Sequence, residues 1–318
     1  MKIPGLTLAL AAAGLLFLAG CATGIRFTPL EGAKGDLLFD YDDMESDRTR
    51  RPISNLVAGE RLTYDASWIG IPVGKLILEN HGLEVVNGEE AYHLTFTTLS
   101  NEFLSRFFKI EDTVHTWISR EEGYPLRFEK VVHEGGYHRH EVIEYDREAL
   151  TATYRRKDRE DREPVTMEID PEAQDVFSMV YWLRRQPIGL GRQLDLSVNA
   201  DRKNWDVVVE VVEKGHFETG PTGEVKALAL APRATHHGRA LKKGNLVAWV
   251  TMDRRRIPLA FEVETPVFGS AVAVLSEAVL PPLEEEPPEA EVAGQTPEGI
   301  YLAGDWIQGL TQAVIGDQ

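Results

Sequence analysis

The sequence predicts a mainly β protein: a curved antiparallel sheet or an open β-barrel with one covering helix. Two observations lead to this fold class. From residue 59 to about residue 280, apolar and polar residues alternate with period two, as in Leu62-Thr63-Tyr64-Asp65-Ala66. Tight-turn pairs such as Asn87-Gly88 and Lys243-Gly244 separate these runs. Few gaps hold a helix-length apolar pattern, which argues against a parallel sheet with crossover helices.

The chain is predicted to have five parts. Residues 1–20 form a signal peptide, and residues 21–58 carry scattered charges without periodicity, which indicates a tether. The β domain spans 59–280, with strands expected at 62–68, 75–79, 92–97, 141–145, 205–211, 225–230 and 246–251. Residues 281–299 form an acidic, proline-rich linker. Residues 300–318 have apolar spacings of a short amphipathic helix, for which docking on its own domain is preferred over a partner or membrane role.

One segment inside the β domain breaks the alternation. Residues 171–185 carry apolar side chains at positions 176, 179, 180 and 183, which is the stripe of a helix. Asp170 would cap its N-terminus, Pro171 suits the first turn, and Arg184 and Arg185 lie at the C-terminal end, where the helix dipole favours cations. We expect this helix to lie across the curved sheet.

The N-terminus carries the strongest localisation signal. Lys2 precedes an apolar run, Leu6 to Gly20, that is shorter than the ~20 residues that span a bilayer. The run ends in Leu18-Ala19-Gly20-Cys21, which resembles the bacterial lipobox, in which the cysteine becomes the lipid-modified N-terminus. Two or three acyl groups such as palmitate on Cys21 would give stable anchoring to membrane lipid. Because Ala22 rather than Asp follows, resemblance to the sorting rule favours the outer membrane, with the domain facing the periplasm.

Composition excludes several classes of protein. The 318 residues have a net charge of −17 and no basic patch, which argues against a nucleic-acid-binding protein. A single cysteine excludes an intrachain disulfide and a multi-cysteine zinc site. Nucleotide-binding, zinc-protease and serine-hydrolase motifs are absent from the sequence, so we expect no cofactor.

Histidines offer the best candidate metal ligands. On a strand, His138 and His140 share one face, and a glycine turn could bring His133 near. The spacing matches no established ligand pattern, so solvent-facing histidines are the preferred interpretation and we expect no tight transition-metal binding. His236 and His237 are weaker candidates because adjacent strand residues point to opposite faces.

Two further groups have an alternative chemical role. Ser178 could be a nucleophile beside Asp175, but no histidine is close in sequence, and the preferred role of Asp175 and Arg184 is to tie the helix to the sheet. Arg254, Arg255 and Arg256 could contact anionic head groups, although a solvated turn is the preferred interpretation.

Several short motifs occur in a characteristic order. They are Gly59-Glu60-Arg61-Leu62-Thr63-Tyr64, Ile71-Pro72-Val73-Gly74-Lys75-Leu76, Asp175-x-x-Ser178 with Tyr181-Trp182-Leu183-Arg184, and Trp249-x-x-x-Asp253 with Arg256-Ile257-Pro258. From about residue 59 to 280 the chain resembles the bacterial DUF3108 family. The resemblance implies a curved antiparallel sheet or open barrel, and it supplies no catalytic residue.

Two function classes follow. The preferred one is a non-enzymatic, membrane-anchored envelope lipoprotein that binds an apolar ligand in its half-barrel, or a protein partner. The aromatic residues available to line such a cavity are Trp68, Phe96, Phe103, Phe107, Phe108, Trp117 and Trp182, although core packing is preferred for any one of them. The alternative is a periplasmic hydrolase that uses Ser178 or a metal near His138.

Overall fold

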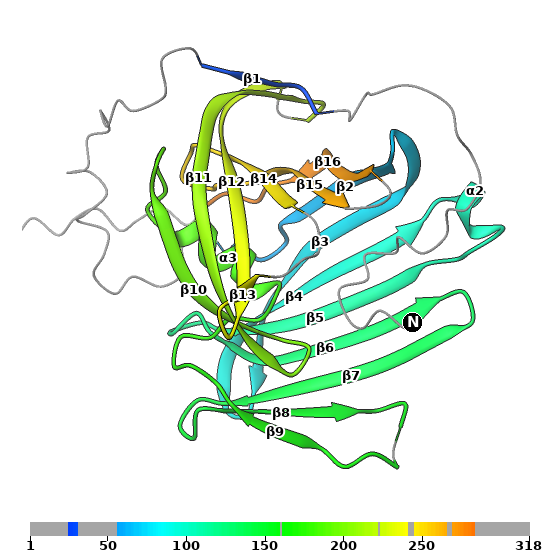
Figure 1. The fold of residues 1–318 in the computed structure, drawn as a ribbon, viewed down its shortest axis with the longest axis vertical. Helices are drawn as coiled ribbons and strands as arrows, with labels where there is room; N and C mark the ends of the chain where they lie inside the picture. The colour runs from blue at the N-terminus through cyan, green and yellow to red at the C-terminus, as the bar shows by residue number, and fades with distance from the viewer. Residues whose placement is uncertain are drawn as a thin grey trace, which may run out of the picture. The chain divides into compact units, whose positions relative to one another are not determined.

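The computed structural model describes residues 25–30 and 56–283, except 160, 222, 241–244 and 266–268. In this part of the chain the mainly β prediction is confirmed, because sixteen strands pair antiparallel and only two short helices accompany them (Figure 1). The helices are α2 (Glu102–Ser105) and α3 (Ser178–Arg185). The strands are β1 (Phe27–Pro29), β2 (Arg61–Trp68), β3 (Ile71–Val86), β4 (Glu89–Ser100), β5 (Glu111–Ser119), β6 (Pro125–Glu134), β7 (Tyr137–Asp146), β8 (Thr151–Arg156), β9 (Val165–Glu168), β10 (Gln193–Ala200), β11 (Lys203–Thr219), β12 (Gly223–His236), β13 (Arg239–Ala240), β14 (Asn245–Thr251), β15 (Pro258–Thr265) and β16 (Gly269–Val279).

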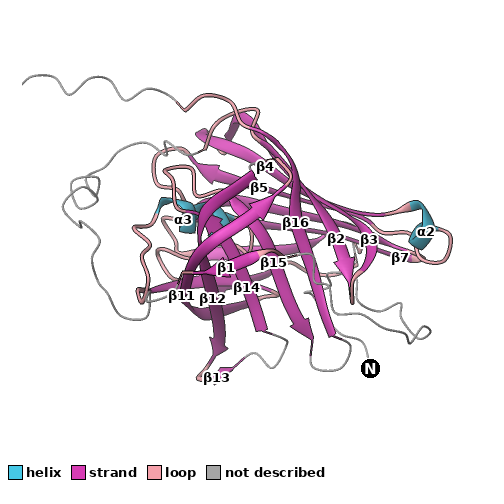
Figure 2. Cartoon of the chain, turned by 90° about the horizontal axis from the view of Figure 1, so that it is seen from above, coloured by secondary structure: helices cyan, strands magenta, loops and turns pink. Residues whose placement is uncertain are grey.

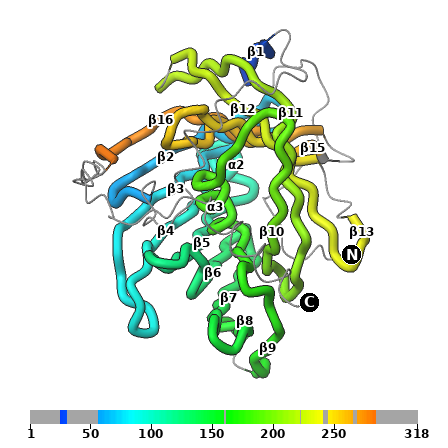
Figure 3. Tube along the Cα trace, turned by 90° about the vertical axis from the view of Figure 1, so that its left-hand side faces the viewer, coloured from blue at the N-terminus to red at the C-terminus, as the bar shows by residue number. Residues whose placement is uncertain are grey.

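The sheet is open rather than a closed barrel. Its strand order is β1-β11-β12-β14-β15-β16-β2-β3-β4-β5-β6-β7-β8-β9, with β10 also paired to β11 and β13 to β12. Strong twist carries β9 round towards the β10–β11 hairpin (Figure 3), and Figure 2 shows the sheet from above. There the Asn204 amide donates to the carbonyl of Glu168 at 2.8 Å, and Gln174 forms an isolated parallel bridge with Val198. We call this junction between β9 and the β10–β11 hairpin the seam.

Helix α3 fills the concave side of the sheet. It lies between the β3–β9 arm and the β10–β12 arm (Figure 3). Tyr181 packs into the larger apolar cluster, to which β2 to β8, β11, β12 and β14 to β16 contribute residues. Met179 and Leu183 pack against a second cluster on β10, β11, β12 and β14. The predicted apolar stripe of the helix therefore faces the core, as amphipathic periodicity requires.

The start of the helix was predicted wrongly. It begins at Ser178, not at residue 171, and Asp170 is not its cap. The backbone that precedes the helix is hydrogen-bonded to β10 at the seam. Gln174 N donates to the Ser197 carbonyl at 2.9 Å, and Asn199 N donates to the Gln174 carbonyl at 2.7 Å. A backbone group committed to a neighbouring strand cannot also complete a helical turn.

The β domain begins earlier in the sequence than predicted. Within the expected tether, β1 pairs with β11, Phe27 opposite Phe217, and Leu56 is buried in the core. The signal peptide, Cys21, most of the tether, the linker beyond residue 283 and the C-terminal helix all lie outside the described residues. Neither described helix has the length and apolar character needed to span a membrane.

Candidate functional site

Asp175 and Ser178 hydrogen-bond the backbone at the start of α3, whose N-cap residue is Phe177, rather than pairing as a nucleophile and its base. One carboxylate oxygen of Asp175 accepts the backbone N–H groups of Phe177 and Ser178, each at 2.7 Å, and the other accepts the Thr116 hydroxyl at 2.5 Å. Ser178 Oγ accepts the Asp175 N–H at 2.8 Å, and the residue is 1% exposed. Burial raises the pKa of the Asp175 carboxyl, which these hydrogen bonds oppose. Asp175 thus ties α3 to β5, as expected.

Arg184 ties the other end of α3 to the sheet. Its guanidinium donates two hydrogen bonds to the Glu60 carboxylate, at 2.7 and 2.8 Å, and both side chains are buried. Arg184 Nε also donates to the carbonyl of Arg255, and Arg256 donates to the carbonyl of Arg184 at 2.8 Å. The Arg255 side chain donates to the Pro281 carbonyl. Arg255 and Arg256 therefore hold α3 and the end of the domain, so the expected solvated turn is wrong for these two residues.

The histidines that the sequence analysis considered as metal ligands have separate partners in the structure. The His133 and His138 rings lie edge to face at 5.0 Å on the β6–β7 hairpin, while His140 Nε2 lies 2.7 Å from Glu129 Oε1. His236 bonds the backbone carbonyl of Asn204, and its ring lies 4.1 Å from that of His237. Within the described residues, no group of three or more His, Cys, Asp or Glu side chains is arranged to hold a metal ion.

A second histidine cluster lies on the outer face of β3, β4 and β5, and the sequence analysis missed it. His93 Nε2 lies 2.9 Å from His115 Nδ1, and His93 Nδ1 lies 2.8 Å from Glu84 Oε1. Trp117 stacks on His93 at 4.6 Å and donates its indole N–H to Glu84. This hydrogen bond lowers the pKa of Glu84, and burial lowers the pKa of both His93 and His115. Only strand register brings these residues together.

Among the described residues, the apolar gap beside α3 leaves little room for a ligand. The apolar gap between α3 and β11 to β15 measures about 60 Å³, and Leu183, Val209, Leu230 and Phe261 are among its lining residues. Pockets that enclose drug-sized ligands measure roughly 300–1,000 Å³. Phe96 is a core residue whose ring packs at a tilt against that of Phe177, in line with the core-packing interpretation of the aromatic residues. This gap is too small for an acyl chain as it stands.

The exposed apolar side chains gather instead at one end of the sheet. Of the ten large hydrophobic residues that are exposed in the described part of the chain, five lie there: Ile69, Ile71, Phe103, Phe107 and Tyr137. They belong to the β2–β3 turn, the α2 loop and the β6–β7 turn, which lie on the right in Figure 1. We call these five residues the apolar end.

Backbone hydrogen bonds hold the three turns of the apolar end side by side. Asn101 N donates to the carbonyl of Val73, and the Asn101 side chain donates to that of Pro72 at 2.7 Å. Gly135 N donates to the carbonyl of Lys109, also at 2.7 Å, which joins the β6–β7 turn to the α2 loop. The surface is therefore fixed by the sheet and does not depend on one loop alone.

Local structure at the apolar end points the apolar side chains outward. Asn101 caps α2 by accepting the Leu104 N–H; Phe103 on this single turn is 61% exposed, and Phe107 in the loop that follows is 77% exposed. Ile69 and Gly70 form the β2–β3 turn with φ of 50° and 75°. A β-branched residue at positive φ is strained, and the first position of such a hairpin turn favours Asn or Asp. Ile69 is therefore both exposed and strained in this turn.

Comparison with known proteins identifies the family. The sequence model of a family described as "Protein of unknown function (DUF3108)" matches residues 63–276. The chain belongs to the DUF3108 family. This confirms the resemblance drawn from the motifs, and the matched DUF3108 region contains both α3 and every turn of the apolar end. No relative was found among the curated proteins.

Two solved structures resemble this DUF3108 chain. A β-barrel-like protein of the DUF1849 family from Brucella abortus has a TM-score of 0.50 and 10% identity, over 71% of this chain and 99% of that chain. A protein from Bacteroides fragilis, described as exported and with a YmcC-like fold, has a TM-score of 0.29 and 10% identity, over 70% of this chain and 97% of that one. The first likeness supports the β-barrel-like fold alone, because folds host many functions.

Proposed function

We propose that this chain is a non-enzymatic, lipid-anchored protein of the bacterial cell envelope whose β domain docks on a lipid surface through its apolar end. Acyl groups on Cys21 would hold it at a membrane, with the outer membrane favoured and the domain facing the periplasm. The observation that carries the docking proposal is the gathering of Ile69, Ile71, Phe103 and Phe107 with Tyr137 at one end of the sheet. Scattered exposed apolar residues are ordinary, whereas a contiguous group indicates a binding surface.

The chemistry of the apolar end suits a membrane interface. Phe103 and Phe107 lie 5.6 Å apart, edge to face, on the protruding α2 loop. Each side chain that leaves water on docking contributes about 1.5–3 kcal/mol when fully buried. Arg106 lies between the two phenylalanines in sequence, where its guanidinium can reach anionic head groups. A surface site also agrees with the small volume beneath α3, which favours docking over an enclosed apolar ligand.

The hydrolase alternative has less support. Ser178 is buried and bonded to the backbone of Asp175, so a substrate would have to displace α3 to reach it. His138 contacts His133 rather than a group of carboxylates or cysteines. Both observations favour the non-enzymatic proposal.

The anchor is tested with Cys21→Ser. We expect this variant to lose its acyl groups and to pass from the membrane to the soluble fraction of the envelope, because the acyl chains supply the anchoring free energy. Mass spectrometry of the mature N-terminus and membrane fractionation measure the two effects. An unmodified Cys21 in the mature wild-type protein would contradict this part of the proposal.

Docking is tested in the absence of the anchor. The mature chain with Cys21→Ser is sedimented with vesicles of phosphatidylethanolamine and phosphatidylglycerol. We expect it to bind, and the added pair Phe103→Ser and Phe107→Ser to weaken binding at least about tenfold, since two apolar side chains are lost from the contact. The matched control is Val85→Ser, which removes a side chain 72% exposed at the opposite end of β3 and should leave binding unchanged.

Two results would overturn the docking proposal. The first is an absence of vesicle binding by the chain without its anchor, which would assign the apolar end to a protein partner. The second is an equal loss of binding from Val85→Ser, which would show that general hydrophobicity rather than this surface drives sedimentation.

A further inference from the structure

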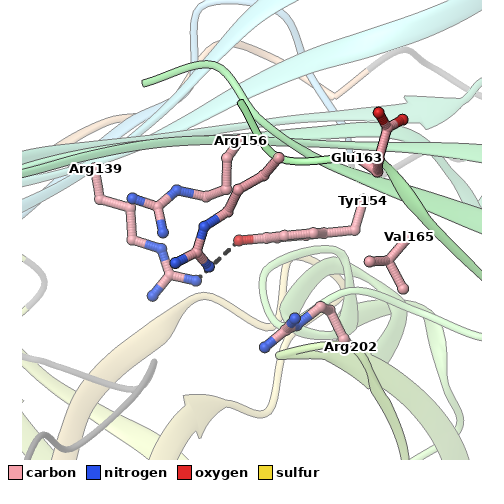
Figure 4. A pocket seen from close by; sticks show the side chains of 7 residues that line it. Arg139, Tyr154, Arg156, Glu163, Val165 and Arg202 are labelled. Carbon is pink, nitrogen blue, oxygen red and sulfur yellow. Dashed lines mark hydrogen bonds between the residues drawn. The ribbon is translucent and has the colours of Figure 1, made fainter. Parts of the chain in front are cut away.

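A pocket of about 210 Å³ opens at the seam (Figure 4). Arg139 comes from β7, Tyr154 and Arg156 from β8, and Arg202 from the β10–β11 turn. The β8–β9 connection and β9 complete the lining with Arg162, Glu163 and Val165. Four arginines thus meet in one cavity of a chain whose net charge is −17.

Two of these arginines have carboxylate partners that fix their positions. Arg139 forms an ion pair with Glu141 and donates to the Tyr154 hydroxyl at 3.0 Å, while Tyr154 donates to the same glutamate. Arg156 donates from Nε to Asp158 at 2.7 Å. Figure 4 shows the Arg139 and Arg156 guanidinium groups side by side near the Tyr154 hydroxyl. They form a preorganised wall of donors, which lowers the entropy cost of binding an anion.

The other two arginines supply unbalanced positive charge. Among the described residues, no carboxylate pairs with Arg162 or Arg202. The Arg202 guanidinium lies over the Tyr154 ring, 5.4 Å from its centroid, which holds it at the pocket without neutralising it. The carboxylate of Glu163 points away from the other labelled side chains in Figure 4. A mobile anion is the species that would complete this charge balance.

Backbone strain marks the same place. Asp201 and Arg202 form the two-residue β10–β11 turn with φ of 51° and 59°. Such turns favour glycine at the second position, and an arginine there costs free energy. Backbone strain of this kind often occurs at binding and catalytic sites, and here the strained residue Arg202 places its guanidinium at the pocket.

We propose that the seam pocket binds a phosphate group, either free or as a monoester, between the Arg139–Arg156 wall and the Arg202 guanidinium. Guanidinium groups bind phosphate through paired hydrogen bonds, and donors that converge from several directions suit its tetrahedral oxygens better than a planar carboxylate. The Tyr154 hydroxyl adds a polar group at the same point. A volume of about 210 Å³ admits a phosphate with a short substituent rather than a whole nucleotide or lipid.

The phosphate could belong to a soluble metabolite or to a lipid head group. Calorimetry with inorganic phosphate and with glycerol 3-phosphate tests the shared chemistry, and vesicles that contain phosphatidic acid, compared with phosphatidylcholine vesicles, test the head group. The protein is the mature chain with Cys21→Ser and with Phe103→Ser and Phe107→Ser, so that docking through the apolar end does not contribute. Success or failure here is therefore independent of the proposed function.

Arg202→Gln is the main variant, and we expect it to weaken phosphate binding at least tenfold. Arg159→Gln is the matched control, because it removes the same charge from the nearby β8–β9 connection, at a residue that does not line the pocket, and should change affinity less than twofold. Arg202→Gly separates binding from folding. It relieves the turn, so the melting temperature should stay equal or rise while phosphate binding is lost.

Each outcome decides the proposal. Saturable phosphate binding that falls with Arg202→Gln and not with Arg159→Gln supports it, and the vesicle comparison then identifies the source. No phosphate binding at millimolar concentration overturns it, as does preferential binding of succinate over phosphate. An equal loss from Arg159→Gln would show only diffuse electrostatic attraction and would also overturn the site.

Discussion

At the scale of single residues, the outer-face pair His93 and His115 gives the domain a defined acid response. Burial lowers the pKa of both imidazoles, and Glu84 and Glu129 oppose this effect only in part. In the unfolded chain each histidine takes up a proton near pH 6.5, whereas the folded chain takes it up at lower pH. The folded state therefore has its full stability above that pH and loses stability as pH falls.

The variant His115→Gln tests this response. Between about pH 7 and about pH 5, we expect its free energy of unfolding to decrease less than that of the wild-type protein, and above pH 7 the two proteins should depend on pH in nearly the same way. Urea unfolding across this range measures the effect, and parallel curves for the two proteins would contradict it.

The structural role of a residue could be predicted where the neighbouring sequence determines it. Asp175 and Arg184 were expected to tie the helix to the sheet, and each does so with a buried partner. Those partners, Thr116 and Glu60, lie 59 and 124 residues away in sequence. No pattern along the chain could identify them, because strand register and the path of the sheet bring them together.

At the scale of elements, α3 joins the two arms of the sheet, and its apolar stripe carries that role. Val180 packs on the larger cluster and lines the gap towards β11. Val180→Asp would place a charge without a partner at this junction, and we expect a loss of about 3 kcal/mol in the free energy of unfolding. Val85→Asp introduces the same charge at a residue 72% exposed and should cost less than about 0.5 kcal/mol. Denaturant unfolding measures both, and equal costs would show that the stripe does not face the core.

The sequence predicted which segments form strands and which forms a helix, but it did not predict the residues at which they begin. Period-two alternation identified the strands, and the helical stripe identified α3. The helix start was placed at residue 171 because Asp170-Pro171 is a common start signal, whereas pairing of Gln174 with β10 delays the helix to Ser178. Likewise, β1 is only three residues long, too short for its alternation to be recognised within the predicted tether.

At the scale of the whole molecule, an open antiparallel sheet packs its interior and carries both proposed binding sites on its outside. In the part of the chain that the structure describes, the concave side is occupied by α3 and two apolar clusters, and the apolar gap beside α3 measures only about 60 Å³. The apolar end and the seam pocket are both products of topology. Their residues come from segments far apart in the sequence, and only the strand order places Asn101 beside Pro72, or Arg202 beside Tyr154.

The central claim is that the apolar end enters a lipid surface while the protein is anchored, and one measurement tests it most directly. Phe107→Trp and Val85→Trp are made separately in the acylated protein, on vesicles whose lipids carry bromine on their acyl chains. The fluorescence of the native tryptophans, measured on the protein without the added tryptophan, is subtracted. We then predict strong quenching of the tryptophan at position 107 and little at position 85, because only the first would lie among acyl chains. Equal quenching at the two positions, or none at 107, would contradict the account.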